Sequence, residues 1–132
     1  MVQSPEEAFA CLNDPSLEAS KREEIIHYLR EHPSSSAAEQ LVQLLDDDAP
    51  GVRWAAAMAL GQYGRVAFPS LLRALTQPNI NVRLREGAHR VLSHTIEPQS
   101  FPHFQELLDA LQGLGANIAT MNVAIKILGG WE

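Results

Sequence analysis

The segment DDDAPGVRWAAAMALGQYG, residues 46–64, constrains the fold of this 132-residue chain more than any other stretch. Three acids and a turn precede a helical segment that its alanines, Val52, Met58 and Leu60 make apolar on nearly every side. A helix that is apolar all round has to be covered by neighbours on several faces. We therefore expect this helix to lie inside a stack of other helices.

The composition is that of a helical globular domain. Hydrophobic residues make up 45% of the chain and charged residues 20%, which is typical of a folded and not a disordered protein. Leucine and alanine are abundant, whereas β-branched and aromatic residues are too sparse for an all-β core. The length fits a single domain. We predict one all-α domain over residues 1–132.

Short Pro, Gly, Ser and Asn breaks divide the chain into about eight predicted helices, which come in pairs. Ser4 before Pro5 is a typical helix start, and Ser36 with Glu39 has the spacing of a capping box. No segment is a convincing strand. The four predicted helical hairpins cover residues 4–31, 37–64, 68–94 and 100–129.

The two central hairpins repeat each other. A shift of 30 residues places LVQLLDDDAPGVR (41–53) on LLRALTQPNINVR (71–83), with Val52 on Val82 and Arg53 on Arg83. Self-similarity at such a period is typical of solenoids. The two outer hairpins lack the Val-Arg pair, as expected of capping repeats that each present a wetter end face.

These residues resemble a known repeat. LLDDDAPGVRWAAAMALGQYG is similar to a HEAT-like repeat of the phycobilisome-lyase-like type, with its leucines, Asp-x-x-Pro, Val-Arg, paired alanines and Ala-Leu-Gly. Residues 71–92 resemble a second, looser copy. The resemblance implies a right-handed α-solenoid of about four hairpins whose second helices line a gently concave face. Such repeats serve as scaffolds, lyase subunits and degradation adaptors, so the resemblance implies a fold and not one function.

Several residues of the central repeat have predicted structural roles. Pro50 suits the first helical position, and Asp48 can cap that helix or lie near its positive end. Arg53 and Arg83 resemble the family arginine that ties adjacent repeats through acids or turn carbonyls, with Asp47 and Asp48 as acceptors. The acidic run lacks the alternate spacing of a calcium loop, which favours this structural interpretation over a cation site.

Two features remain as candidates for a binding groove. RLREGAHR, residues 83–90, concentrates basic side chains that could bind carboxylates of a partner, tetrapyrrole propionates or phosphates; the alternative is an ordinary solvated face. Trp54 and Met58, one turn apart, could anchor a partner or be buried against the next repeat. The candidate groove comprises Trp54, Met58, Arg85, His89 and Arg90.

Other features argue against several function classes. The net charge of −6 disfavours a nucleic-acid partner. The single cysteine, Cys11, excludes an internal disulfide and fits a reducing compartment. Neither a secretory signal nor an apolar run of membrane-spanning length is visible, so we expect a cytoplasmic protein without a membrane span. His89 and His94 diverge on a helix and no nucleophile motif occurs, so we predict no metal site, no cofactor and no catalytic residues.

The leading hypothesis is a non-enzymatic protein–protein interaction module or adaptor that binds another protein on its concave face. The alternative, implied by the resemblance alone, is a tetrapyrrole (bilin) lyase-like or chromophore-handling protein of phycobilisome metabolism. Chromophore contact would need a basic groove with an apolar floor.

Overall fold

The computed structural model describes residues 2–77, 80–101, 103–112 and 116–131, without the side chains of residues 117, 130 and 131. These ranges hold eight α-helices and two short 3-10 helices, with no strand among them. In chain order the elements are α1 (Pro5–Leu12), α2 (Ala19–Arg30), α3 (Ser35–Leu44), α4 (Pro50–Tyr63), η1 (Gly64–Ala67), α5 (Phe68–Leu75), α6 (Val82–His94), η2 (Pro98–Ser100), α7 (Phe104–Ala110) and α8 (Ala116–Trp131).

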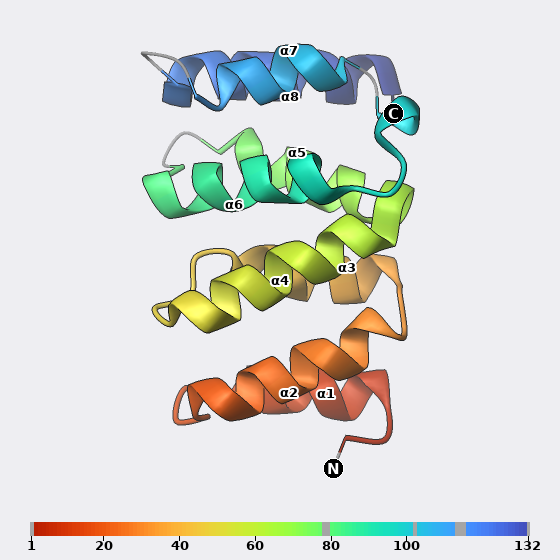
Figure 1. Cartoon of the computed structure of the whole chain (residues 1–132), viewed down its shortest axis with the longest axis vertical. Helices are drawn as coiled ribbons and strands as arrows, with labels where there is room; N and C mark the ends of the chain where they lie inside the picture. Colours follow the sequence, from red (N-terminus) through yellow and green to blue (C-terminus); the bar gives the residue numbers. More distant parts are fainter. Residues whose placement is uncertain (1, 78–79, 102, 113–115, 132) are drawn as a thin grey trace.

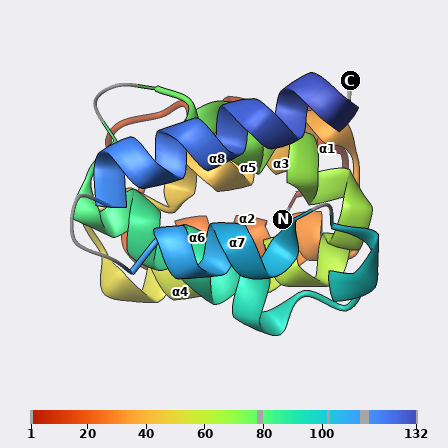
Figure 2. The ribbon, with the colours of Figure 1, turned by 90° about the horizontal axis from the view of Figure 1, so that it is seen from above.

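The helices form four hairpins stacked along the long axis of the molecule (Figure 1). Seen from above, they make two layers, one of α1, α3, α5 and α8 and the other of α2, α4, α6 and α7 (Figure 2). Each hairpin contacts the hairpins before and after it. This is the α-solenoid that the sequence predicts.

The last hairpin is reversed relative to the other three. Its first helix, α7, packs on α6, and its second helix, α8, packs on α5, so α8 joins the layer of first helices. The ring of Phe101, after η2, lies 4.1 Å from that of Phe68 and 6.2 Å from that of Phe104 (centroid distances), so the link into this hairpin is packed through an aromatic cluster. The sequence predicts a layer made of the second helix of each hairpin. In the structure this layer consists of α2, α4 and α6 and ends with α7, the first helix of the last hairpin.

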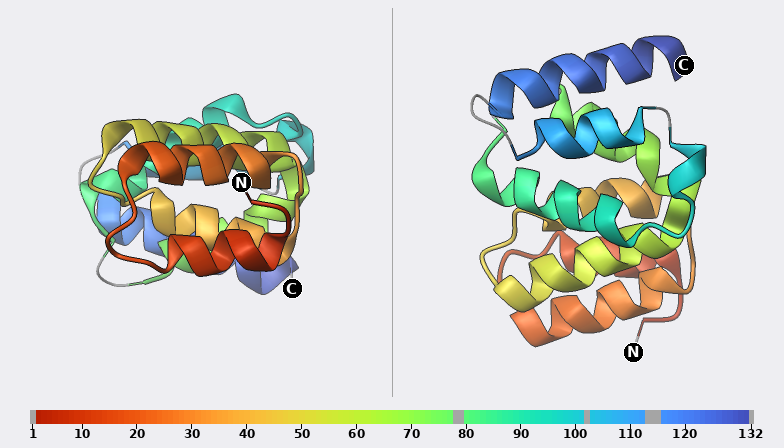
Figure 3. Two further views of the ribbon diagram at one scale, coloured as in Figure 1. Left: turned by 90° about the horizontal axis from the view of Figure 1, so that it is seen from below. Right: turned by 45° about the horizontal axis from the view of Figure 1, so that its top comes forward.

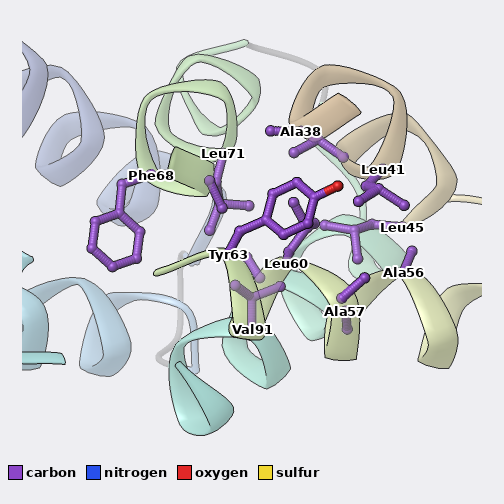
Figure 4. Close-up of a cluster of buried hydrophobic side chains, with 14 of the residues drawn as sticks. Ala38, Leu41, Leu45, Ala56, Ala57, Leu60, Tyr63, Phe68, Leu71 and Val91 are labelled. Carbon is purple, nitrogen blue, oxygen red and sulfur yellow. The ribbon is translucent and has the colours of Figure 1, made fainter. Parts of the chain in front are cut away.

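Helix α4 is covered on several sides, as its apolar sequence predicts. It contacts α2, α3 and α6, and Ala56, Ala57 and Leu60 are buried in these contacts. Figure 4 shows them beside leucines of α3 and α5 and Val91 of α6. The Tyr63 hydroxyl in this cluster donates a hydrogen bond to the Leu29 carbonyl, and burial raises the pKa of Tyr63 to about 12.

Two glycines let the end of α4 meet the following hairpin. A Cβ on Gly61 would lie 3.1 Å from the carbonyl oxygen of His94, so α4 and α6 touch through backbone. The Gly61 carbonyl also accepts a hydrogen bond from the Ile96 amide at 3.2 Å. Gly64 ends α4 with φ of 59°, a conformation that side-chain-bearing residues avoid.

One predicted helix start is confirmed and another is displaced. The Ser4 hydroxyl caps α1 by accepting from the Glu7 amide at 3.2 Å, as expected. Helix α3 is capped by Ser34, whose hydroxyl accepts from the Ala37 amide at 3.0 Å, and not by Ser36. Three consecutive serines offer the same chemistry, and the first that reaches a free amide from an extended conformation becomes the cap.

Candidate functional site

An open hollow of about 480 Å³ lies between α6 and the end of α7. Its α6 side includes three of the five predicted groove residues, and its α7 side includes Leu111 and Gln112. The lining residues are Val82, Arg85, Glu86, His89, Arg90, Ser93, His94, Leu111 and Gln112. We call this hollow the α6–α7 pocket.

The arginines of the pocket have no anionic partner among the described residues. The Nε atom of Arg85 is buried and makes no hydrogen bond within the described part of the chain. The guanidinium of Arg90 lies 4.5 Å from the ring centroid of Trp54, a cation–π contact. Glu86 is the single acidic residue in the lining. The pocket is therefore positively charged in a protein whose net charge is −6.

Trp54 stands at the border of this pocket. Its side chain on α4 is 49% exposed, and its ring meets the His94 ring edge-on with centroids 6.2 Å apart. Met58, one turn along α4, is half-buried and does not line the pocket. The structure thus brings together four of the five candidate residues, and Met58 is the one left apart.

His89 connects the two walls of the pocket. The Gln112 amide lies 2.8 Å from its Nε2. The Ser93 hydroxyl, 3.5 Å from Nδ1, donates to the His89 carbonyl at 2.8 Å. Sequence analysis did not single out Gln112, because residues from different hairpins meet here.

The acidic turn between α3 and α4 binds both neighbouring hairpins. On the N-terminal side, Asp47 meets Arg22 of α2 through two contacts of 3.1 Å, and both side chains are largely buried. Asp47 also accepts from the Ala49 amide at 3.0 Å, which closes the turn. Removing one partner of a pair this shielded from water costs more than at the surface, because the other charge stays buried without a partner.

On the C-terminal side, the two flanking acids reach α6. Asp48 meets Nη1 of Arg83 at 3.1 Å, and Asp46 accepts from the Asn81 side-chain amide at 3.1 Å. Asn81 is also the N-cap of α6, accepting from the Leu84 amide at 2.8 Å. Three consecutive acids thus join three hairpins.

Among the described residues, no three His, Cys, Asp or Glu side chains gather closely enough to hold a metal ion. Nor does the described part of the chain contain a helix that is long and apolar enough to cross a membrane.

A family model described as HEAT repeats matches residues 6–85, which is more than half of the chain. The chain belongs to the HEAT-repeat family. No curated protein and no solved structure matches it. The family match ends inside α6, so most of the residues that line the α6–α7 pocket lie beyond the matched HEAT repeats.

The arginines of the HEAT repeats differ in whether they connect two hairpins or bond within one. Arg83 reaches back to the preceding hairpin, whereas Arg53 donates to the carbonyls of Asp47 and Asp48, at 2.7 and 3.2 Å, within its own hairpin. Arg22, which sequence analysis missed, makes the third connection. The signal was present, because Arg22 precedes Arg53 by nearly the same interval that separates Arg53 from Arg83.

At two positions the structure goes beyond what the repeat pattern predicts: it excludes one of the two roles expected for Asp48, and it separates two aligned valines. Asp48 does not cap α4: the N-cap is Ala49, without a side-chain cap bond, and Pro50 follows in the first turn as predicted. Val82, which aligns with Val52, is 55% exposed, whereas Val52 is fully buried. Val82 is the first residue of α6 and lines the open α6–α7 pocket.

Proposed function

We propose that this HEAT-repeat protein is a non-enzymatic interaction module that binds another protein across α4, α6 and α7. The observation that carries the proposal is the α6–α7 pocket, where Arg85 and Arg90 lack anionic partners among the described residues and lie beside the exposed Trp54. HEAT repeats commonly mediate protein–protein interaction, which supports the same function class. Tryptophan and arginine are also the residues that most often dominate binding energy at interfaces.

The chemistry of the pocket favours an acidic segment of the partner. Arginine forms paired, charge-assisted hydrogen bonds with carboxylates, and it does so more strongly where water is partly excluded. Val82 and Leu111 give the lining apolar positions for a neighbouring apolar side chain. The expected ligand is therefore a peptide segment with Asp or Glu next to an apolar residue.

Affinity capture with matched charge reversals tests this function. The test variant is Arg85→Glu with Arg90→Glu, and the control is Arg30→Glu with Arg65→Glu, two exposed arginines outside the pocket. A partner captured by the wild type and by the control should be lost by the test variant, with helix content unchanged by circular dichroism. Equal capture by all three proteins would show that the pocket is not the binding surface.

A defined probe tests the chemistry of the ligand. In a Trp131→Phe background, Trp54 becomes the sole tryptophan and reports on the border of the pocket. A Glu-rich peptide with one leucine should change Trp54 fluorescence to saturation, and a Lys-rich peptide of equal length should not. Equal responses to the two peptides would reject an acidic ligand.

The second candidate is chromophore handling of the phycobilisome-lyase-like type. One observation favours it: the pocket arginines have no anionic partner in the described part of the chain and lie beside apolar positions, so they could take the propionates of a tetrapyrrole. Titration with a bilin separates the two functions, because a bound bilin shifts its visible absorbance. An unshifted spectrum at saturating bilin removes this candidate and leaves the interaction module in place.

A further inference from the structure

The N-terminal end of the stack carries a second hollow, of about 420 Å³, between α1 and α2. Leu17, Ile25 and Tyr28 contribute apolar surface to it. Seen from below, α1 and α2 lie side by side with no further helix over them (Figure 3). In a stack of hairpins this is the position that a preceding hairpin would occupy.

The hollow opens away from the stack and is rimmed by carboxylates. Arg22 of α2 points to the next hairpin, and Glu24 lies about 200° round the helix from it, on the outer side. Glu7 and Glu31 also line the hollow. Lys21 is its single Lys or Arg, 3.6 Å from Glu24, so the rim has an excess of negative charge.

The C-terminal end presents an apolar stripe. Ile118 and Ile125 of α8 are 66% and 52% exposed, and they lie two turns apart on the side opposite the buried Ala124 and Ile127. Met121, between them, is half-buried. A capping repeat has a polar outer face, and this apolar stripe departs from that rule.

The charge of α8 suits the rim of the hollow. Helix α8 has no acidic residue, and its single charged residue is Lys126. Lys126 pairs with Glu106 of α7 at 3.1 Å, yet more than half of its side chain is exposed and open to a second carboxylate. An acidic chain would repel a copy of itself at most surfaces, whereas this helix meets acids without repulsion.

We propose that the two ends bind each other, with α8 of one copy seated in the α1–α2 hollow of the next. Ile118, Met121 and Ile125 have the i, i+3 and i+7 spacing with which an amphipathic helix enters an apolar groove. The second copy extends the stack in the direction in which its own hairpins already pack. Because the two surfaces differ, the association is head-to-tail and gives linear oligomers and not a closed dimer.

Sedimentation of the full chain over a range of concentrations tests this association. The weight-average mass of the wild type should rise with concentration above the 14.5 kDa of one chain. Ile118→Asp with Ile125→Asp blocks one end, Tyr28→Asp blocks the other, and each variant alone should stay monomeric. Ile96→Asp, at an exposed isoleucine outside both surfaces, is the matched control and should associate like the wild type.

Mixing the two blocked variants gives the decisive result. Each retains one intact end, so an equimolar mixture should form dimers and stop there. A wild type that stays monomeric throughout, a blocked variant that still forms oligomers, or a mixture of folded variants that stays monomeric would each overturn the proposal. If Tyr28→Asp lowers helix content, Glu24→Lys with Glu31→Lys replaces it. Arg85→Glu with Arg90→Glu should associate normally, which separates this test from that of the proposed function.

Discussion

The middle of the stack and its two ends differ in how completely the chain covers itself. In the middle, α4 is enclosed by α2, α3 and α6, and the turn at Asp46–Ala49 bonds the hairpins on both sides. At the ends, α8 exposes Ile118 and Ile125, and the α1–α2 hollow stays open. The α6–α7 pocket also forms where the last hairpin reverses. Stability comes from the regular repeats, and candidate binding surfaces arise where the regularity ends.

The largest difference in stability is expected between truncating an apolar residue in the middle of the stack and truncating one at its end. Leu60 is fully buried in α4, so Leu60→Ala should lower the free energy of unfolding by about 2–5 kcal/mol through lost burial and a residual cavity. At concentrations where the chain is unassociated, Ile118→Ala should change it by less than about 0.5 kcal/mol, because the side chain is then already in water. Urea denaturation of both variants measures the difference. Similar losses would mean that the ends are as well packed as the middle.

Two adjacent acids of the central turn, Asp47 and Asp48, should also contribute differently to the free energy of unfolding. Asp47→Ala leaves the largely buried Arg22 without its partner and should cost about 2 kcal/mol or more. Asp48→Ala removes a pair whose carboxylate is almost fully exposed and should cost less than about 1 kcal/mol. A double-mutant cycle between Arg22 and Asp47 isolates their coupling. A coupling near zero would show that this ion pair does not hold the hairpins together.

The two valines that the sequence aligns, Val52 and Val82, should also differ in how much stability is lost when each is replaced by alanine. Val52→Ala should lower stability by about 1–3 kcal/mol because Val52 is fully buried. Val82→Ala should have an effect within about 0.5 kcal/mol. Thermal unfolding of the two variants compares them directly. An equal loss at Val82 would indicate that α7 covers α6 more than the structure shows.

The last prediction concerns how the stability of the folded protein depends on pH through Tyr63. Burial raises its pKa to about 12 in the folded protein, against about 10 when unfolded. A raised folded-state pKa favours the protonated form, so its contribution is complete below pH 10 and is lost as the pH rises towards 12. Unfolding free energies between pH 8 and 12 should therefore fall more steeply for the wild type than for Tyr63→Phe. Parallel curves would contradict a buried tyrosine at this position.

Much of the fold could be predicted because the repeated pattern is local. Residues 50–63 are apolar on nearly every side, and the pattern around them recurs 30 residues later. Together these two features predict stacked helical hairpins. The cap of α3 was misplaced by two residues because neighbouring serines have equal capping chemistry. Arg22 was missed although its spacing from Arg53 repeats that of Arg83.

The reversal of the last hairpin could not be predicted in this way. The link that leads into this hairpin packs Phe101 against Phe68, a contact between distant segments that no local period encodes. The exposure of Val82 and the meeting of His89 with Gln112 follow from the same arrangement. The candidate residues on α6 could be found from sequence, whereas the wall that faces them could not.

The most direct test of the central claim is to map where an acidic ligand binds. Amide NMR spectra of the full chain, titrated with a Glu-rich peptide, should show shifts at residues 82–94, at Gln112 and at the Trp54 indole, following one common binding curve. The same titration of Arg85→Glu with Arg90→Glu should leave these signals in place. Shifts confined to other basic positions such as Lys21 and Arg30, or an unchanged spectrum at saturating peptide, would contradict the claim that the reversed hairpin creates the binding surface.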